Sequence, residues 1–362
     1  MHPLLSPAKL HNLELKNRIV RSATWTGTAT VEGEVSGELI ARMVECARGG
    51  VGLIVTGHAY VQPRGHASLR QIAVYSDRFA EGLKRLTDQL HEAGGVVALQ
   101  LAHAGVNAIE GTEQPPWCVS PVDGVERQQV MTVSDIEQLV SDFVAAGVRA
   151  RDAGFDAVML HSGHGYLLSQ FLSPSFNRRE DAYGGDIEGR ARIHCEILRG
   201  LRNALGEAYP LLVKMNGNDN VKDGLTPEDA AAAARLMEAA GCNAVELSGG
   251  LLRSIKYSPS RMAISSEKKE AYFREDARVV KSAISIPLIL VGGMRSLPVM
   301  ESVIDSGDAE FISLSRPLIC EPDLVNRWQS GDRAPSRCRS DNRCFKPGFE
   351  GRGVSCPHRE KS

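Results

Sequence analysis

Short apolar runs alternate with longer segments of helical periodicity along most of this 362-residue chain. Each run is rich in valine, isoleucine and leucine, as expected for strands that are buried on both faces of a parallel sheet. A succession of eight strand-and-helix units predicts an α/β protein with a single (β/α)8 barrel, and a doubly wound sheet is the alternative. The predicted strands are residues 18–23, 51–57, 96–102, 157–162, 210–217, 243–250, 287–293 and 309–316.

This repeating pattern ends near Gly331, so the barrel is predicted to occupy residues 1–331. Residues 332–362 are rich in basic residues, glycine and cysteine. We expect them to form a short cysteine-containing C-terminal tail that is packed on the barrel or trails from it. A long polar segment, residues 107–129, follows the third strand and is predicted to be a lid or insertion over the barrel mouth.

Capping residues indicate where two of the helices begin. Thr226 followed by Pro227 is a typical helix start, because proline is tolerated in the first turn. Ser134 and Asp135 are predicted to cap the helix that follows the long polar segment.

Composition and charge exclude several classes of function. The chain is 43% hydrophobic and 24% charged, as soluble globular proteins are, and its net charge of −2 gives no electrostatic case for nucleic acid. No apolar run approaches the roughly 18 residues of a membrane span, and the first residues lack the layout of a signal peptide. A cytoplasmic protein without a membrane partner is predicted. No GxGxxG lies between a strand and a helix, and no P-loop motif occurs.

The segment His161-Ser-Gly-His164-Gly-Tyr166 begins at the end of the fourth predicted strand, where a barrel enzyme has its active site. Two neutral imidazoles that converge on a carbonyl oxygen can stabilise the negative charge that develops when hydride arrives at the β-carbon. A tyrosine hydroxyl stays protonated at neutral pH and can supply a proton. We therefore expect Tyr166, His161 and His164 to be catalytic, with both histidines also binding the substrate.

Two alternatives remain open for the histidines. They can be zinc ligands, with His103 at the end of the third strand as a third ligand, or polar residues satisfied by nearby backbone. No acidic residue is placed as in the HExxH zinc motif, which makes zinc the less favoured interpretation.

The stretch HGYLLSQFLSP, followed by NRREDAYGG, resembles the signature of the Old Yellow Enzyme family of FMN oxidoreductases. The resemblance spans nearly the whole chain, from PLLSPAKLHNLELKNRIVRSA to ISLSRPLICEPDL. It implies a barrel that binds FMN, is reduced by NADH or NADPH and is reoxidised by an activated alkene such as an α,β-unsaturated carbonyl compound. It also implies that His161 and His164 hold the acceptor oxygen and that Tyr166 donates the proton.

The FMN phosphate is expected where the last two strands end, a common phosphate site of such barrels. Gly292 and Gly293 offer backbone N–H groups there, while Ser315 and Arg316 add a hydroxyl and a bidentate cation. The alternative is that the glycines only turn the chain and that Arg316 pairs with a surface carboxylate.

Contacts to the flavin ring are expected from the ends of other strands. Gln100 carries both a donor and an acceptor for the pyrimidine edge of the ring. Lys214 is expected to steady negative charge at flavin N1, and a salt bridge to Glu246 on the next strand is the competing explanation. Ala23, Thr24 and Gly57 are expected to lie nearest the ring.

Two features depart from the family pattern. Trp25 stands where relatives often have threonine or cysteine near the flavin, and we expect it to bind substrate and narrow the space for it. The tail resembles the cysteine-bearing ends of larger relatives that carry an iron–sulfur cluster. Asp341 stands where a fourth thiolate is expected, so no cluster is expected. The remaining metal-ligand candidates are Cys338, Cys344 and Cys356.

The predicted function is therefore hydride transfer from NADH or NADPH through FMN to an activated alkene. The same barrel and cofactor also serve dehydrogenases and demethylases, so the direction of the reaction stays open. Two other hypotheses are a flavin-binding sensor without ene-reductase turnover and a flavin-free, aldolase-like enzyme that uses Lys214 as a Schiff-base amine. The expected partners are a small-molecule substrate and a nicotinamide, and a homo-oligomer is compatible with the sequence.

Overall fold

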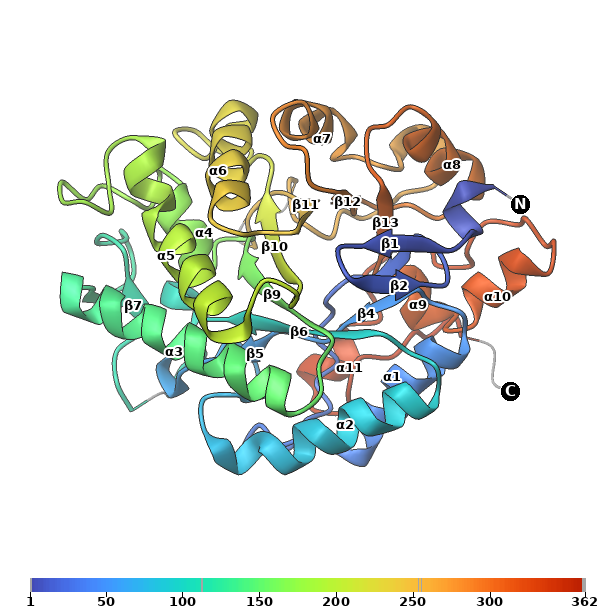
Figure 1. The fold of residues 1–362 in the computed structure, drawn as a ribbon, viewed down its shortest axis with the longest axis horizontal. Helices are drawn as coiled ribbons and strands as arrows, with labels where there is room; N and C mark the ends of the chain where they lie inside the picture. The colour runs from blue at the N-terminus through green and yellow to red at the C-terminus, as the bar shows by residue number, and fades with distance from the viewer. Residues whose placement is uncertain (1, 112, 253, 255, 360–362) are drawn as a thin grey trace.

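Eight parallel strands close into a barrel, which confirms the predicted fold class (Figure 1). The computed structural model describes residues 2–111, 113–252, 254 and 256–359. Closure is complete because the last strand pairs with the first and the remaining neighbours pair in chain order. The barrel strands are β3 (Ile19–Arg21), β4 (Leu53–Val55), β6 (Val97–Ala102), β9 (Ala157–Ser162), β10 (Leu211–Asn216), β11 (Ala244–Ser248), β12 (Leu288–Leu290) and β13 (Phe311–Leu314).

Amphipathic helices surround the barrel and cover its outer face (Figure 1). As predicted, α6 begins at Pro227 with Thr226 as its N-cap. The predicted start of α3 at Ser134 is wrong: Thr132 is the N-cap, and its hydroxyl and the Asp135 carboxylate form a capping box. The longer helices are α1 (Gly37–Arg48), α2 (Ala80–Glu92), α3 (Val133–Asp152), α5 (Ile187–Leu205), α6 (Pro227–Ala239), α7 (Arg274–Lys281) and α8 (Leu297–Asp305).

Short elements complete the fold. The helices α4 (Leu167–Leu172), α9 (Arg316–Cys320), α10 (Leu324–Gln329) and α11 (Lys346–Phe349) lie near the C-terminal ends of strands or in the last part of the chain. A two-residue strand β5 (Ala59–Tyr60) pairs with β6, and β7 (Trp117–Cys118) pairs with β8 (Gln129–Val130). Among the described residues, no helix combines the length and the apolar character that crossing a membrane requires.

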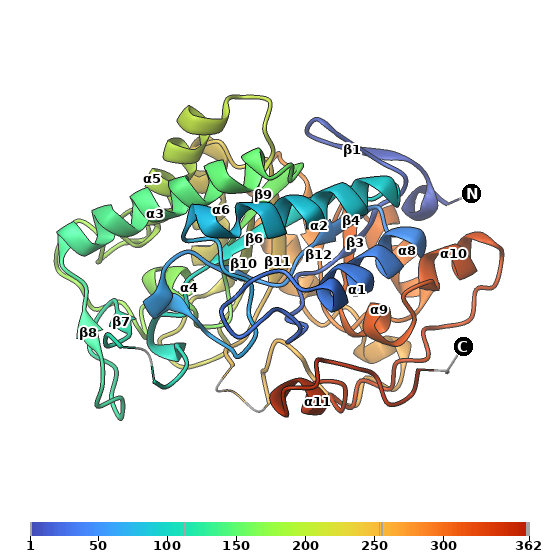
Figure 2. The same cartoon turned by 90° about the horizontal axis from the view of Figure 1, so that it is seen from below.

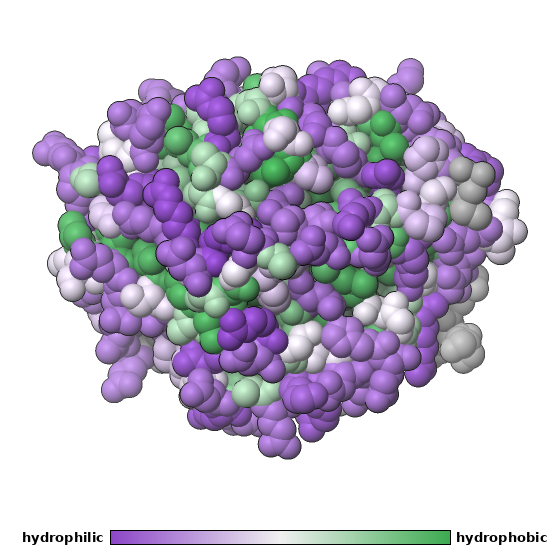
Figure 3. All heavy atoms as spheres, in the orientation of Figure 1, coloured by the Kyte–Doolittle hydropathy of each residue, from purple (hydrophilic) through white to green (hydrophobic). Residues whose placement is uncertain are grey.

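A hairpin closes the N-terminal end of the barrel. Its strands β1 (Ala8–Leu10) and β2 (Leu13–Leu15) pair antiparallel, and their leucines pack against inward-facing residues such as Met159 and Phe311. This apolar plug leaves the opposite end, where the strands finish, as the place for a site. Figure 2 shows the hairpin and α11 at opposite ends of the molecule. The face that carries the hairpin is mostly hydrophilic on the outside, with scattered apolar residues (Figure 3).

The C-terminal tail packs on the barrel mouth. The backbone N–H of Val354 donates to the carbonyl of Thr26 over 2.7 Å, and the Ser336 N–H donates to the Arg295 carbonyl over 2.9 Å. These bonds join the end of the chain to loops that follow β3 and β12. The division into a barrel of residues 1–331 and a tail of residues 332–362 stays a prediction; residues 360–362 lie outside the described part.

Candidate active site

A cavity of about 660 Å³ opens at the C-terminal ends of the barrel strands. It has the size and place expected of a ligand site in a barrel. Most of the predicted site residues line it. From the predicted set these are Ala23, Thr24, Trp25, Gln100, His161, His164, Tyr166, Lys214 and Ser315.

His161, His164 and Tyr166 form one cluster in this cavity. The ring centroids of His161 and His164 are 5.1 Å apart, and those of His161 and Tyr166 are 4.9 Å apart. Both ring pairs meet edge to face. His161 Nδ1 is buried and has no hydrogen-bond partner among the described residues. A buried donor or acceptor without a partner is costly unless a ligand satisfies it.

The backbone after β9 turns these side chains into the cavity. His164 adopts a left-handed conformation with φ of 65°, and Gly165 follows with φ of 83°. The His164 N–H donates to the Asn216 side-chain oxygen over 3.0 Å, while its ring Nε2 lies 2.8 Å from the Ser248 hydroxyl. Two neighbouring strands, β10 and β11, thus hold the imidazole in place.

Burial keeps these groups neutral. Desolvation, with smaller effects from the neighbouring histidines and Lys214, lowers the pKa of His161 and of His164 well below the ordinary value. Desolvation also raises the pKa of Tyr166 above its ordinary value of 10. At neutral pH the site therefore presents neutral imidazoles and a protonated phenol, which are hydrogen-bond donors without net charge.

His58 belongs to the same cluster, although it was not among the predicted site residues. Its Nε2 lies 3.4 Å from the Tyr166 hydroxyl, and its ring centroid is 6.2 Å from that of His161. Desolvation lowers the pKa of His58 to about 4. The available signal was its position, three residues beyond the end of β4 and thus at the same rim of the barrel as His161.

Gln100 and Lys214 also face the cavity from inside the barrel. The Gln100 amide nitrogen has a 3.3 Å contact to the Met159 sulfur, which is a weak acceptor. Lys214 donates to the Glu246 carboxylate over 2.8 Å and to the Ser22 hydroxyl over 2.7 Å. The salt bridge that competed with the flavin as an explanation for Lys214 is therefore present, and the lysine reaches the cavity as well.

The ends of β3 and β13 form another part of the cavity wall. The Thr24 hydroxyl is 2.8 Å from the Ser315 hydroxyl and donates to the Ser22 carbonyl over 2.9 Å. Gly57 does not line the cavity; it lies behind Thr24, where an added Cβ would come within 3.0 Å of the Thr24 carbonyl oxygen. Its role is close packing of two strand ends, and its predicted place next to a flavin ring stays untested.

A small pocket adjoins the cavity at the ends of β12 and β13. Gly293, Ser315 and Arg316 line it, whereas Gly292 lies behind, against Tyr272 and Phe273. The Arg316 guanidinium is buried and donates to the Arg261 carbonyl over 2.9 Å and to the Asn342 side-chain oxygen over 2.8 Å. The alternative that Arg316 pairs with a surface carboxylate is wrong for the described residues, because its partners, which also include the Tyr272 side chain, are neutral.

These residues fit FMN on two observations. The cavity presents an amide, a lysine and hydroxyl groups at one rim, and the adjoining pocket offers the Arg316 cation without a carboxylate among the described residues to neutralise it. Gly293 has φ of 70°, and an added Cβ would come within 2.5 Å of the Tyr272 ring, so the backbone at the pocket must be glycine. Such bare backbone next to a cation suits a phosphate.

The structure does not bring His103 to the other histidines as a zinc ligand. Its ring stacks on Trp117 at 5.6 Å, and its Nδ1 accepts the Gly105 N–H over 3.1 Å. Within the described ranges, no group of three or more His, Cys, Asp or Glu residues is arranged to hold a metal ion.

The tail cysteines lie apart from the cavity. Asp341, in the position of the missing fourth thiolate, is 2.8 Å from His358 Nε2 and forms a salt bridge with it when the imidazole is protonated. Cys356 accepts a hydrogen bond from Cys320, a cysteine of α9 that the tail pattern had not included, and this bond lowers the pKa of Cys356 to about 6. The tail metal site stays a hypothesis without support among the described residues.

The tail, and not the long segment after β6, covers the cavity. Phe345, Lys346 and Phe349 line it, and the Phe349 ring lies 5.4 Å from that of Trp25. From residues 107–129 only Asn107 lines this cavity, so the predicted lid over the mouth is wrong for most of that segment. Residues between Ile109 and Trp117 line a second cavity instead.

Comparisons with known proteins agree with this site. Residues 3–334 match the model of the NADH:flavin oxidoreductase / NADH oxidase family. The chain is 34% identical over 337 residues to a NADH oxidase of Thermoanaerobacter brockii, with 91% of this chain and 51% of the relative covered. It is 33% identical over 380 residues to a 4,4'-dithiodibutanoate disulfide reductase of Rhodococcus erythropolis, with 96% and 93% covered.

Two solved structures have the same fold. A 2-naphthoyl-CoA reductase in complex with 2-naphthoyl-CoA has a TM-score of 0.87 and 27% identity, covering 98% of this chain and 56% of that chain. The Old Yellow Enzyme homologue from Zymomonas mobilis has a TM-score of 0.78 and 22% identity, covering 96% and 98%. The chain thus spans about half the length of some relatives and nearly the full length of others.

Proposed function

Because the chain belongs to the NADH:flavin oxidoreductase / NADH oxidase family, we propose that it passes hydride from NADH or NADPH through FMN to an activated alkene. The membership in the Old Yellow Enzyme family that the sequence predicted is confirmed, and with it the class of NAD(P)H:flavin oxidoreductase. The alkene as substrate rests on one observation, the neutral donor cluster of His161, His164 and Tyr166 in the cavity.

FMN, when bound, supplies a hydride acceptor and donor. Gln100 and Lys214 would hold the ring, while Gly293, Ser315 and Arg316 would hold the phosphate. The ion pair with Glu246 keeps the Lys214 ammonium in a fixed place within hydrogen-bonding range of Ser22. The same contacts occupy the Lys214 amine, which makes it less available as the free nucleophile that a Schiff base needs.

His161 and His164 would donate N–H hydrogen bonds to the carbonyl oxygen of the substrate. Their depressed pKa values keep both rings neutral, so each has one donor and no charge to disperse. Negative charge grows on that oxygen when hydride reaches the β-carbon, and fixed donors in a buried site stabilise such charge strongly. The contacts of His164 to Asn216 and Ser248 hold this donor in position.

Tyr166 would give its phenolic proton to the α-carbon. Burial raises its pKa, which keeps the proton on the oxygen until a carbanion is available. His58 Nε2, at 3.4 Å, is placed to stabilise the phenolate that remains if this nitrogen carries the proton. Trp25 and the tail residues Phe345 and Phe349 would exclude water from this part of the cavity.

The proposal is tested first by cofactor binding. Purified protein is expected to be yellow with flavin absorption, or to become so after addition of FMN, and to be bleached by NADH or NADPH without oxygen. Protein that stays colourless in excess FMN would refute the proposal. The oxidants for reoxidation are a cyclic enone and, because of the relative from Rhodococcus erythropolis, 4,4'-dithiodibutanoate. Turnover of the disulfide alone would replace the alkene as the substrate class.

The proton donor is tested with Tyr166→Phe. This variant should bind FMN and be reduced by nicotinamide at the rate of the unchanged protein, but its oxidation by an enone should slow by about 10²- to 10⁴-fold, the usual contribution of a positioned acid. Single-turnover absorbance separates the two half-reactions. An unchanged oxidative rate would contradict the role of Tyr166.

A further inference from the structure

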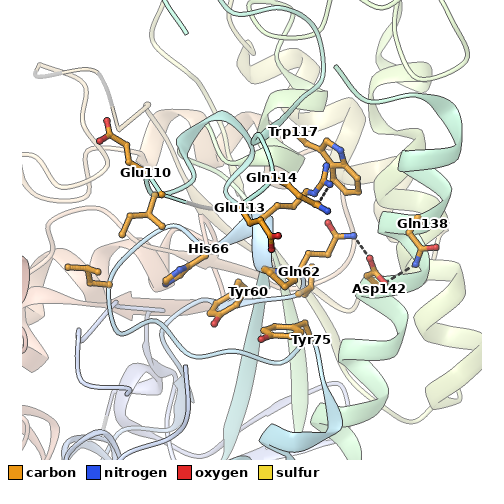
Figure 4. Close-up of a pocket in the computed structure, with 16 residues that line it drawn as sticks. Tyr60, Gln62, His66, Tyr75, Glu110, Glu113, Gln114, Trp117, Gln138 and Asp142 are labelled. Atoms are coloured by element: carbon orange, nitrogen blue, oxygen red, sulfur yellow. Dashed lines mark hydrogen bonds between the residues drawn. The ribbon is translucent and has the colours of Figure 1, made fainter. Parts of the chain in front are cut away.

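A second cavity of about 800 Å³, whose lining residues are drawn in Figure 4, lies beside the active-site cavity, because residues adjacent in sequence line the two. Both cavities share the same wall: Ala67 and Ser68 line the first, whereas His66 and Leu69 line the second. In the same way, Asn107 lines the first cavity and Ile109 lines the second. A ligand that passes over this wall can therefore reach both cavities.

Hydrogen bonds fix the wall between the cavities. The Ala104 N–H donates to the Gly65 carbonyl over 3.0 Å, and the Ile109 N–H donates to the His66 carbonyl over 2.8 Å. Gly65 lies against the His103 ring, where a Cβ would come within 2.4 Å of a ring carbon. The second cavity is thus lined by two loops that are tied to each other and to the barrel, together with Gln138 and Asp142 of α3.

Aromatic rings line the second cavity. Tyr60 and His66 are stacked with ring centroids 4.7 Å apart, and Tyr75 lies 5.5 Å from Tyr60. Trp117 is 4% exposed; because His103 stacks on its ring at 5.6 Å and Arg64 lies 4.3 Å from its centroid, it offers the cavity its indole N–H and not an open ring face. Walls of this kind favour a flat aromatic group over an aliphatic chain.

Buried polar atoms in these walls lack partners. The Trp117 Nε1 donor, the Gln62 Oε1 acceptor and the His66 Nε2 atom are buried without a hydrogen-bond partner among the described residues. Figure 4 shows Gln62 between Trp117 and Asp142, with its amide nitrogen bonded to the Asp142 carboxylate, which fixes the direction of the amide. A ligand that satisfies these atoms needs both a donor and an acceptor on its ring edge, as adenine has.

The charge of the lining is acidic. Among the described lining residues, Glu110, Glu113 and Asp142 are acidic and Arg64 is the one basic residue; its guanidinium lies 4.3 Å from the Trp117 ring centroid. Burial lowers the pKa of His66, so this ring adds no positive charge at neutral pH. Carboxylates accept hydrogen bonds from free ribose hydroxyls and repel a phosphate monoester on the ribose.

We propose that the second cavity binds the adenosine half of the nicotinamide donor and that its acidic lining selects NADH over NADPH. This inference rests on the proposed function, because the nicotinamide must reach the first cavity while the adenine lies in the second. Stacking on the aromatic walls and bonds to Gln62 and Trp117 hold the base. Glu110 and Glu113, both exposed at the rim, discriminate against the 2'-phosphate.

The first experiment measures flavin bleaching of the FMN-loaded protein in anaerobic single turnovers with three donors. NADH should saturate at about tenfold lower concentration than NADPH, and at about tenfold lower concentration than dihydronicotinamide mononucleotide, which lacks adenosine. Equal concentrations for NADH and the mononucleotide would overturn the inference. If all three donors fail to bleach the flavin, the proposed function itself fails.

Charge reversal at the rim tests the selectivity. The double variant Glu110→Lys/Glu113→Lys should lower the saturating concentration of NADPH by about tenfold. The saturating concentration of dihydronicotinamide mononucleotide should stay the same. The matched control, Glu81→Lys/Glu92→Lys, makes the same charge change at exposed positions of α2. If the ratio of the saturating concentrations of NADPH and NADH were the same in both double variants, Glu110 and Glu113 would not select between the two donors.

A binding measurement without catalysis completes the test. Calorimetric titration of ADP-ribose and of its 2'-phosphorylated form into the FMN-loaded protein should give binding of the first and about tenfold weaker binding of the second. Trp117→Phe keeps an aromatic ring at this position but removes the indole N–H donor, and it should weaken ADP-ribose binding several-fold. The rim variants, which do not touch the core, decide the question if Trp117→Phe does not fold. Absence of ADP-ribose binding would overturn the inference.

Discussion

The two ends of the barrel differ although the same strands build both. Inward-facing positions in the lower half of these strands are apolar, and two residues further along they become polar. Ala98 is followed by Gln100 on β6, Met159 by His161 on β9, and Leu212 by Lys214 on β10. Because side chains in a strand alternate, these pairs point to the same interior in successive layers.

This difference separates stability from chemistry along the barrel axis. The lower layers and the β1–β2 hairpin bury apolar side chains that need no partner. The upper layer holds polar groups that are neutral, ion-paired or without a partner, such as His161 Nδ1. Polar groups of this kind lower the stability of a fold unless a ligand binds them. The apolar burial at the hairpin end therefore offsets the loss of stability that these polar groups cause at the site end.

The largest expected effect is at the hairpin end. Leu10 is fully buried in the plug, so Leu10→Ala should lower the free energy of unfolding by about 2–5 kcal/mol, the range for such cavity-forming changes in cores. Urea unfolding of the FMN-loaded protein measures this change. The rate of flavin reduction by NADH in the folded protein should not change.

A control variant for Leu10→Ala lies one residue away. Lys9 is exposed on the same strand and forms a surface salt bridge with Glu14. Lys9→Ala should change the free energy of unfolding by less than about 1 kcal/mol. If Leu10→Ala altered flavin reduction as strongly as stability, the separation between the two ends would be wrong.

The next effect is at the site end and has the opposite pattern. His161→Ala removes one hydrogen-bond donor to the substrate oxygen and should slow oxidation by an enone by about 10²- to 10³-fold. His161→Asn retains a donor and should recover part of that rate. Unfolding in urea should change little or become less favourable for His161→Ala, because this variant removes a buried polar atom that has no partner among the described residues. A large loss of stability with a normal rate would contradict the proposed role.

Acid should destabilise the fold through its buried histidines. Burial lowers the pKa of His58 to about 4 and that of His103 and His194 to about 3, so the folded protein resists protonation of these rings while the unfolded chain takes up protons below its ordinary value of 6.5. Their stabilising contribution is complete above pH 6.5. It falls by about 1.4 kcal/mol per histidine for each pH unit below that value, down to the folded pKa.

Thermal unfolding between pH 7 and pH 5 measures this acid effect. His194 lies outside the cavity, where its Nε2 is 2.7 Å from the Ser162 hydroxyl, and serves for comparison with the site histidines. Enone oxidation should stay nearly constant over the same range, because the depressed pKa values of His161 and His164 keep both donors neutral. A melting temperature that does not fall toward pH 5 would contradict neutral burial.

The sequence predicted the barrel well because each strand carries its own local signal. All eight runs of buried apolar residues became strands, and β9 has the predicted bounds. The cluster after β9 was equally accessible, since His161, His164 and Tyr166 lie close together in the chain. His58 was missed because a single histidine after β4 has no neighbours in sequence that indicate its function; only barrel closure brings it to Tyr166.

The segments around the mouth could not be placed from local patterns. Residues 107–129 have the composition of a lid, but the bond from the Ile109 N–H to the His66 carbonyl holds the start of this segment beside the active-site cavity. The tail has no periodicity, and its position over the cavity depends on contacts such as Val354 with Thr26. Contacts between segments so distant in sequence are set by tertiary packing, which propensity and periodicity do not encode.

The smallest expected effect is at the C-terminal ends of the barrel strands, where the tail covers the active-site cavity. Phe349 is 72% exposed and meets the Trp25 ring at the edge of the cavity. Phe349→Ala should change the free energy of unfolding by no more than about 0.5 kcal/mol, as surface changes do, and Val31→Ala, at a site 65% exposed, is the matched control. The KM for a bulky enone should change several-fold while that for a small enone stays constant, because only the larger molecule reaches this edge. Equal changes for both enones would mean that the tail acts through the flavin side of the cavity and not through its width.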